Sequence, residues 1–140
     1  YRISKDTRDN RFNPTSGYYY ALSEQFAGLG GDINYLSSIL RGSYYHKYDY
    51  VDMVIGISGE YGNIEGLDEN VSKSNRFFLG GRKVRGFDSS GIGPRVSESS
   101  SSSAVGGNNY YVRRVALRSG IGFPSETGIQ WTVFTDFGTL

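Results

Sequence analysis

A chain of 140 residues is long enough for one domain, and no shift in composition marks a boundary between two. Its 15 basic and 14 acidic residues leave a net charge of +1, so no overall field predicts nucleic acid or another polyanion as a partner. Because cysteine is absent, a disulfide framework and a thiol site are both excluded.

Aromatic residues make up 15% of the chain and there are 20 glycines, which favours tightly turning β-structure over helices. No stretch reaches the roughly 20 apolar residues of a membrane-spanning helix, in agreement with a mean hydropathy of −0.43. If the chain crosses lipid, it does so with barrel strands. It begins with Tyr1, shows no basic-plus-apolar leader and stops at Leu140 after a strand-like run, so we interpret it as a fragment.

Tyr18 to Ala27 is the first predicted strand, since apolar residues alternate there with polar or small ones, as in a strand with one lipid-facing side. Glu24 is the exception on the apolar side, which otherwise carries Tyr18, Tyr20, Leu22 and Phe26. Ile33 to Tyr45 and Asn109 to Leu117 have strand-like compositions but mixed alternation. Both also fit strands of a soluble protein, because a simple lipid face is interrupted by Arg41, Arg113 and Arg114.

Two segments, Val51 to Gly62 and Ile129 to Gly138, alternate cleanly. In the first, the apolar face carries Val51, Met53, Ile55, Ile57, Gly59 and Tyr61. In the second, the apolar face carries Ile129, Trp131, Val133, Thr135 and Phe137. The opposite, polar face of the second segment contains Asp136, which is therefore predicted to point into the barrel.

Turn-forming residues separate these strands at 13–17, 28–32, 46–49 and 120–124, so the prediction is an all-β antiparallel meander. One connection, from about Gly62 to Gly107, is far longer than the others. It contains the segment GGRKVRGF at 80–87 and a serine-rich run at 97–103. Loops of this length are usually functional or disordered. We expect an ordered part around Arg85 and a floppy serine tip.

Arg85 is the strongest candidate for a functional side chain. Taken alone it is most simply a surface arginine in a turn, but Asp136 lies inside a strand, where an aspartate is out of place without a partner. An unpaired guanidinium inside a barrel would cost several kcal/mol. We therefore predict that Arg85 pairs with Asp136.

Other site chemistries have little support in the sequence. His46 is the single histidine, so a histidine-based metal cluster or catalytic triad cannot be assembled. The glycines at 80–86 lack the spacing of a phosphate-binding loop. Because no nucleophile, base and orienting group can be grouped, we expect no enzyme activity, no metal and no cofactor.

Six segments, in order, resemble the C-terminal barrel of the bacterial outer-membrane insertase family, the BamA-type assembly factors. The wider superfamily includes TamA and the two-partner-secretion transporters. The matching segments are 6–17, 76–81, 84–87, 91–95, 104–108 and 134–138. Of these, GIGPR at 91–95 and AVGGN at 104–108 favour the BamA-type branch over the transporters.

The resemblance implies a sixteen-stranded transmembrane β-barrel preceded by POTRA domains. Residues 1–140 would be a partial barrel domain, about strands eight to thirteen, without POTRA domains and with the sixth extracellular loop at about 62–107. In the family this loop folds into the lumen. A loop latch of Val84, Arg85, Gly86 and Phe87 would then meet an anchor of Phe134, Asp136 and Gly138. Gly86 is expected to let the loop backbone approach the wall, and Phe87 to pack beside it.

By the same resemblance, the protein folds and inserts outer-membrane proteins in the bacterial outer membrane without cofactor or covalent chemistry. Its expected partners are unfolded client proteins, accessory lipoproteins and the lipid bilayer, with no nucleic acid. Two alternatives stay open. One is a two-partner-secretion type polypeptide transporter pore, and the other is a soluble β binding module whose tyrosine clusters form a ligand surface.

Overall fold

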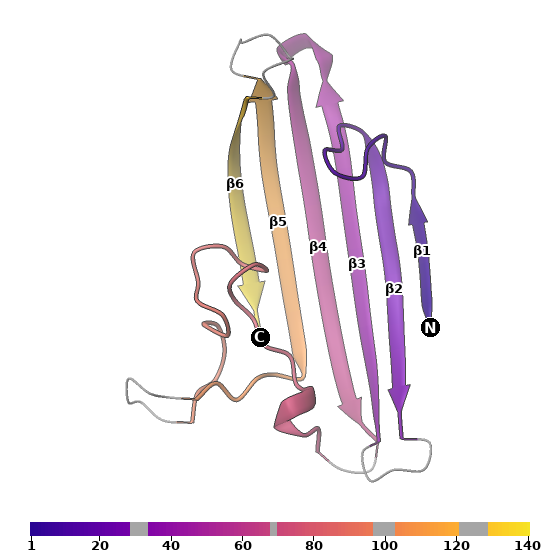
Figure 1. Cartoon of the computed structure of the whole chain (residues 1–140), viewed down its shortest axis with the longest axis vertical. Coiled ribbons are helices and arrows are strands. Elements are labelled where there is room, and N and C mark those ends of the chain that lie inside the picture. Colours follow the sequence, from indigo (N-terminus) through magenta and orange to yellow (C-terminus); the bar gives the residue numbers. More distant parts are fainter. Residues whose placement is uncertain (29–33, 68–69, 97–102, 121–128) are drawn as a thin grey trace.

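The computed structural model describes residues 1–28, 34–67, 70–96, 103–120 and 129–140. These residues form one sheet of six antiparallel strands that neighbour each other in chain order, as Figure 1 shows. The strands are β1 (Arg2–Asp6), β2 (Gly17–Ala27), β3 (Tyr35–Tyr48), β4 (Met53–Gly66), β5 (Asn109–Gly120) and β6 (Gln130–Thr139). The predicted all-β antiparallel meander is confirmed.

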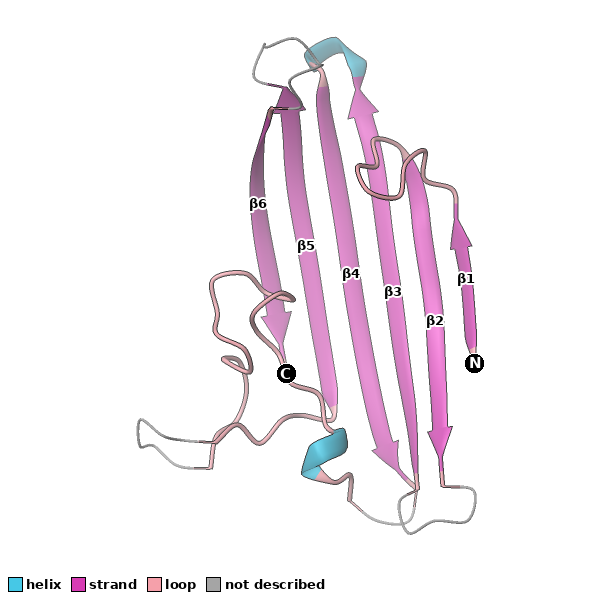
Figure 2. Cartoon of the chain, in the orientation of Figure 1, coloured by secondary structure: helices cyan, strands magenta, loops and turns pink. Residues whose placement is uncertain are grey.

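Helical structure in the described residues is confined to two 3₁₀ turns, Asp49–Val51 and Lys73–Asn75 (Figure 2). No helix in these ranges is long and apolar enough to span a membrane.

The central strands are longer than the sequence pattern predicts. His46 and Lys47, expected in a turn, extend β3 and pair with Ile55 and Val54 of β4. Strand β4 likewise continues to Gly66. Cross-strand partners override local turn preference at these positions, so the chain reverses later, at the 3₁₀ turn. The predicted turns at 28–32 and 120–124 lie largely outside the described residues, as does the serine run from 97 to 102.

The strand register assigns side chains to two faces of the sheet. Glu60 of β4 lies opposite Val112 of β5, and Arg114 of β5 lies opposite Asp136 of β6. Because residues two apart in a strand share a face, Glu60, Arg114 and Asp136 point to the same side, which we call the inner face. The alternation predicted for β4 and β6 therefore places both acidic residues on the inner face.

The same register accounts for the mixed composition of β3 and β5. Arg41 lies opposite Glu60, and Arg114 lies opposite Asp136, so each of these arginines faces a carboxylate on the inner face. Only Arg113 of the three arginines points to the other side, the outer face. Lys5 and Glu24 also lie on the outer face. Most of its other side chains are apolar or aromatic, and the exposed ones are Tyr18, Tyr20, Leu40, Tyr44, Ile57, Tyr61, Trp131, Val133 and Phe137.

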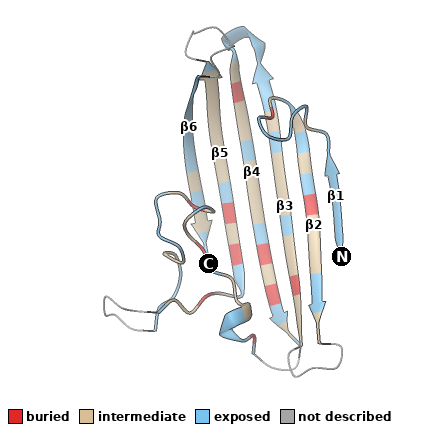
Figure 3. Ribbon diagram, viewed as in Figure 1, coloured by how far each residue is buried: buried red, intermediate tan, exposed pale blue. Residues whose placement is uncertain are grey.

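Most buried residues lie where the connection between β4 and β5 meets the ends of these strands, as the red bands in Figure 3 show, with others on β2 and at the far end of β4. Leu79 and Val84 from the connection pack with Tyr110 and Val112 of β5. Isolated bridges between Phe77 and Gly107, Leu79 and Ile92, and Arg95 and Ala104 give the connection its own internal pairing. The part around Arg85 is thus packed against the sheet.

Candidate functional site

The segment 81–87 is a closed turn that projects from the connection onto the inner face. The N–H group of Gly81 donates to the carbonyl of Phe87 at 2.9 Å, and that of Lys83 donates to the carbonyl of Gly80 at 3.2 Å. At its tip Val84 is only 2% exposed. Burial of this apolar side chain fixes the position of the basic residues on either side of it.

Val84 can approach β6 because residue 138 is a glycine. A Cβ atom at Gly138 would lie 2.5 Å from Cγ2 of Val84 and 3.1 Å from a methyl carbon of Leu79. The first separation is shorter than carbon atoms tolerate and the second is tight, so any larger residue would push the loop away. Gly138 therefore provides the space in the wall that the loop occupies.

Arg85 and Asp136 form a two-pronged ion pair between loop and wall. Nε of Arg85 donates to Oδ2 of Asp136 at 2.7 Å, and Nη2 donates to Oδ1 at 2.7 Å. The backbone N–H of Arg85 donates to Oδ2 as well, at 3.1 Å. The Asp136 side chain is 3% exposed. Such parallel charge-assisted hydrogen bonds fix the orientation of both side chains as well as their separation.

Two further wall residues surround this pair. Nε of Arg114 donates to Oδ1 of Asp136 at 3.0 Å, and its Nη2 donates to the carbonyls of Arg82 and Lys83 at 3.3 Å each. The guanidinium carbon of Arg85 lies 3.2 Å from the ring centroid of Phe134, a cation–π contact. Asp136 therefore shares its charge between a loop arginine and a wall arginine.

Glu60 of β4 forms a second contact with the loop, which the sequence analysis missed. Nζ of Lys83 lies 2.6 Å from Oε1 of Glu60, and Nε of Arg41 donates to Oε2 at 2.7 Å. The hydroxyl of Tyr110 donates to Oε1, and the Lys83 ammonium also lies 3.9 Å from the Tyr110 ring centroid. Glu60 was detectable, since it is a carboxylate on the predicted polar face of its strand, as Asp136 is.

The structure places all seven predicted site residues, but it changes the expected roles of two. A Cβ atom at Gly86 would have no neighbour within 4 Å, so Gly86 is not a point of close approach. Its φ of +88° is what favours glycine there. The Phe87 side chain is 53% exposed, and the ring beside the guanidinium belongs to Phe134. The close approach between loop and wall occurs at Gly138 of β6, where the missing side chain leaves room for Val84.

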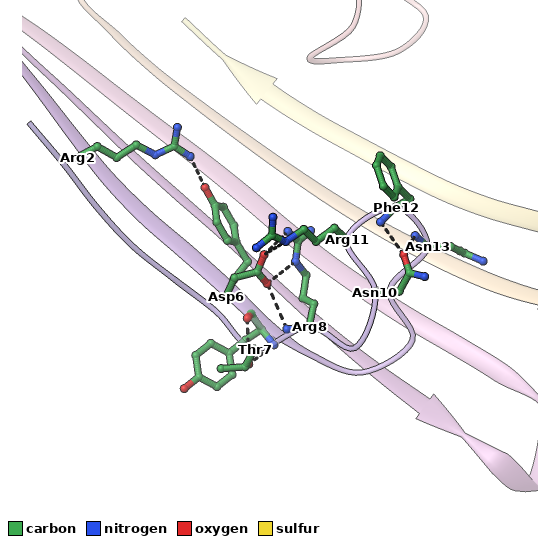
Figure 4. Close-up of polar contacts among 10 residues, drawn as sticks. Arg2, Asp6, Thr7, Arg8, Asn10, Arg11, Phe12 and Asn13 are labelled. Atoms are coloured by element: carbon green, nitrogen blue, oxygen red, sulfur yellow. Dashed lines mark hydrogen bonds and ion pairs between the residues drawn. The ribbon is translucent and has the colours of Figure 1, made fainter.

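A second connection, 7–16, lies over the far end of the inner face. Arg118 of β5 donates to the side chain of Asn13 and to the carbonyl of Pro14. Figure 4 shows the side-chain amide oxygen of Asn10 accepting from the N–H groups of Phe12 and Asn13, at 2.8 and 3.0 Å. The internal turn shapes this connection, and the hydrogen bonds from Arg118 hold it against the sheet.

Comparison with known proteins identifies the family. The model of the Omp85 superfamily domain matches residues 1–140. The outer membrane protein assembly factor BamA of Neorickettsia risticii is 34% identical over 142 residues, covering 100% of this chain and 19% of that protein. The protein of the same name from Nitratidesulfovibrio vulgaris is 27% identical over 140 residues, covering 98% of this chain and 17% of that protein. The chain thus spans about a fifth of the length of these curated relatives.

Two further comparisons extend the match. A SAM50-like protein of Schizosaccharomyces pombe is 32% identical over 123 residues, covering 84% of this chain and 25% of that protein. The crystal structure of BamA from Haemophilus ducreyi lacking POTRA domains 1–3 superposes with a TM-score of 0.84 at 20% identity, over 99% of this chain and 29% of that one. The predicted resemblance is confirmed, and the chain belongs to the Omp85 superfamily and forms part of a β-barrel of the bacterial outer membrane.

Proposed function

We propose that this chain is part of an insertase that folds and inserts outer-membrane β-barrel proteins. The relatives named above support this assignment, because the two that match nearly the whole chain are both called outer membrane protein assembly factors. In this proposal unfolded outer-membrane proteins are the clients. Accessory lipoproteins of the assembly machinery and the surrounding bilayer are the other partners.

The structural role that we assign to the chain is to supply barrel wall and to hold the long loop inside the barrel. The ion pair between Arg85 and Asp136 carries this part of the proposal, since it joins the loop to a wall carboxylate that is almost completely buried. The contact between Lys83 and Glu60 supports it from a neighbouring strand. In this proposal the full-length protein has POTRA domains followed by a sixteen-stranded barrel. The chain would supply about strands eight to thirteen of that barrel and its sixth extracellular loop.

This role requires no covalent chemistry. Holding and releasing a loop is a conformational task, so the proposal contains no catalytic residue and no cofactor. A polypeptide-secretion pore of the same superfamily is the principal alternative, and the names of the two BamA relatives favour assembly over secretion. The exposed apolar outer face disfavours a soluble binding module, because a face of this kind in water would promote association.

A double-mutant cycle in the full-length protein tests the proposal. Arg85→Ala, Asp136→Ala and the double variant are reconstituted in liposomes, and insertion of a client barrel protein is scored by its resistance to added protease. Residues that act as one unit give strongly non-additive losses. We expect the double variant to lose no more insertion activity than the worse single variant.

Near-wild-type insertion by all three variants would remove the pair from the mechanism. Wild-type protein that inserts no client, while exporting a partner polypeptide, would favour the secretion pore. Tyr61→Phe is a suitable control, since it changes an exposed outer-face side chain on a strand of the same sheet.

A further inference from the structure

A hollow of about 400 Å³ lies on the outer face, across the four neighbouring strands β2 to β5. At its centre Gly42 of β3 pairs with Gly59 of β4, so two facing positions have no side chain. A Cβ atom at Gly42 would meet nothing within 4 Å. Aromatic and apolar side chains form its sides: Tyr18, Tyr20, Tyr44, Ile57 and Tyr111.

Arg113 of β5 lies at the edge of this hollow, directly opposite Gly59 in the register. It is exposed, and none of the ion pairs among the described residues includes it. A cation on the lipid-facing side of a barrel is costly unless it reaches the interface or finds an anionic partner. Arg113 therefore differs from Arg41 and Arg114, whose carboxylate partners lie on the inner face.

The side chain of Arg113 is directed toward the end of β5 that adjoins the 67–108 connection. Its guanidinium carbon lies 6.0 Å from the ring centroid of Tyr111, the next outer-face residue in that direction. Tyr111 lies opposite Tyr61 of β4, so a pair of tyrosines marks this level of the outer face. Tyrosines are enriched at membrane interfaces, where arginine heads also reach the lipid phosphates.

The hollow extends from Arg113 away from that interface. Gly42 and Gly59 lie level with Arg113, and Tyr44 and Ile57 lie one outer-face row farther from the connection. Tyr18 and Tyr20 form the opposite side, with nearly parallel rings whose centroids are 6.2 Å apart. A cation at the interface and an apolar trough leading into the bilayer together match the two ends of a phospholipid.

We propose that this hollow binds one anionic phospholipid from the leaflet nearest the 67–108 connection, with its phosphate held by Arg113 and an acyl chain lying over Gly42 and Gly59. Arginine is well suited to the phosphate because its planar group donates two parallel hydrogen bonds. The site is independent of the loop contacts, since it lies on the opposite face of the sheet.

Native mass spectrometry of the full-length protein in detergent tests this site, with phosphatidylglycerol as the probe and phosphatidylcholine for comparison. We expect Arg113→Gln to weaken binding of one phosphatidylglycerol by about tenfold, as for a lost charge-assisted hydrogen bond. Gly42→Val should weaken it as well, by filling the hollow, since a Cβ atom at this position meets nothing within 4 Å.

Arg11→Gln is the matched control, since Arg11 is a cation of the 7–16 connection whose side chain is 81% exposed and does not line the hollow. It should leave binding unchanged. Equal binding of phosphatidylglycerol by the wild type and Arg113→Gln would overturn the proposal. An equal loss in Arg11→Gln and Arg113→Gln would also overturn it, by showing that lipid binding follows the overall charge of the protein and not this hollow.

Discussion

The two carboxylates that contact the loop, Asp136 and Glu60, have partners of the same charge in different surroundings. Each binds one loop cation and one wall arginine. The Asp136 side chain is 3% exposed and takes a two-pronged arginine, whereas that of Glu60 is 20% exposed and takes a lysine. Glu60 also borders a hollow of about 310 Å³ between loop and wall, which Asp136 does not line.

We therefore expect burial and geometry, more than the number of ion pairs, to decide which contact holds the loop. The Asp136 carboxylate is shielded from water, so its removal breaks hydrogen bonds that water does not readily replace. A partly exposed pair is screened, and water replaces the missing partner. We therefore expect Asp136 to contribute most of the free energy that holds the loop against the wall, and Glu60 to contribute less and to adjust the position of the loop.

The largest effect should come from Asp136→Asn. This change keeps the shape of the side chain but leaves Arg85 and Arg114 facing each other without a carboxylate. We expect the barrel to lose about 3 kcal/mol of unfolding free energy. Urea unfolding of the full-length protein in lipid vesicles measures this value. A loss equal to that of Glu60→Gln would contradict the ranking of the two sites.

Gly138→Ala should have the next largest effect, since it places a methyl group where Val84 packs. Overpacking of this kind destabilises by about 2 kcal/mol. The same urea titration measures it. Gly59→Ala is the control, because its added Cβ would meet only the Val112 carbonyl, at 3.6 Å, an ordinary contact. Equal losses in the two variants would show that the loop does not need the space at Gly138.

Glu60→Gln should be milder, with a loss of about 1 kcal/mol. The amide still accepts a hydrogen bond from Arg41 or Lys83, and the 20% exposure of the Glu60 side chain lets water reach the site. The loss should shrink at high salt, because exposed pairs are screened. Repeating the titration in 0.1 M and 1 M salt checks this point. A loss that does not change with salt would mean that Glu60 is as well shielded as Asp136.

The smallest effect concerns Asp9, an exposed carboxylate that is held by neutral donors. The Thr15 hydroxyl and the backbone N–H groups of Ser16 and Thr15 lower the pKa of Asp9 below its ordinary value. Because the folded pKa lies below the unfolded one, this stabilisation is present above about pH 4 and is lost as the pH falls. The Tm difference between wild type and Asp9→Asn should therefore narrow from pH 6 to pH 3. A Tm difference that stays constant over this pH range would show that the charge of Asp9 is not what stabilises the wild type.

The sequence predicted the sheet well where alternation was clean. The patterns in 51–62 and 129–138 place Glu60 and Asp136 on the polar faces of their strands. Side chains alternate between the two faces of a strand wherever the strand begins and ends, so errors in the predicted ends do not affect this assignment. The patterns of β3 and β5 were ambiguous, since their inner-face arginines are compensated by carboxylates on other strands. Such compensation is a tertiary property and has no local signal.

The loop contacts were only partly predictable. The pairing of Arg85 with Asp136 joins residues far apart in the chain, and it was inferred from strand alternation together with family resemblance. The polar face of the 51–62 segment also marks Glu60 as a strand carboxylate that needs a cation, but nothing in the sequence identifies Lys83 as that cation. The sequence could not show that the loop and the wall approach each other closely at Gly138 and not at Gly86, because this depends on which surface the loop contacts in the folded protein.

The central claim is that Asp136 holds the Arg85 segment against the wall. Trypsin cleavage of the bond after Arg85, followed by mass spectrometry of the full-length protein in liposomes, tests it most directly. The wild type should be protected at this bond, and Asp136→Asn should be cleaved about tenfold faster or more, because cleavage follows the open population. Equal cleavage rates in the two proteins would show that the ion pair does not hold the loop.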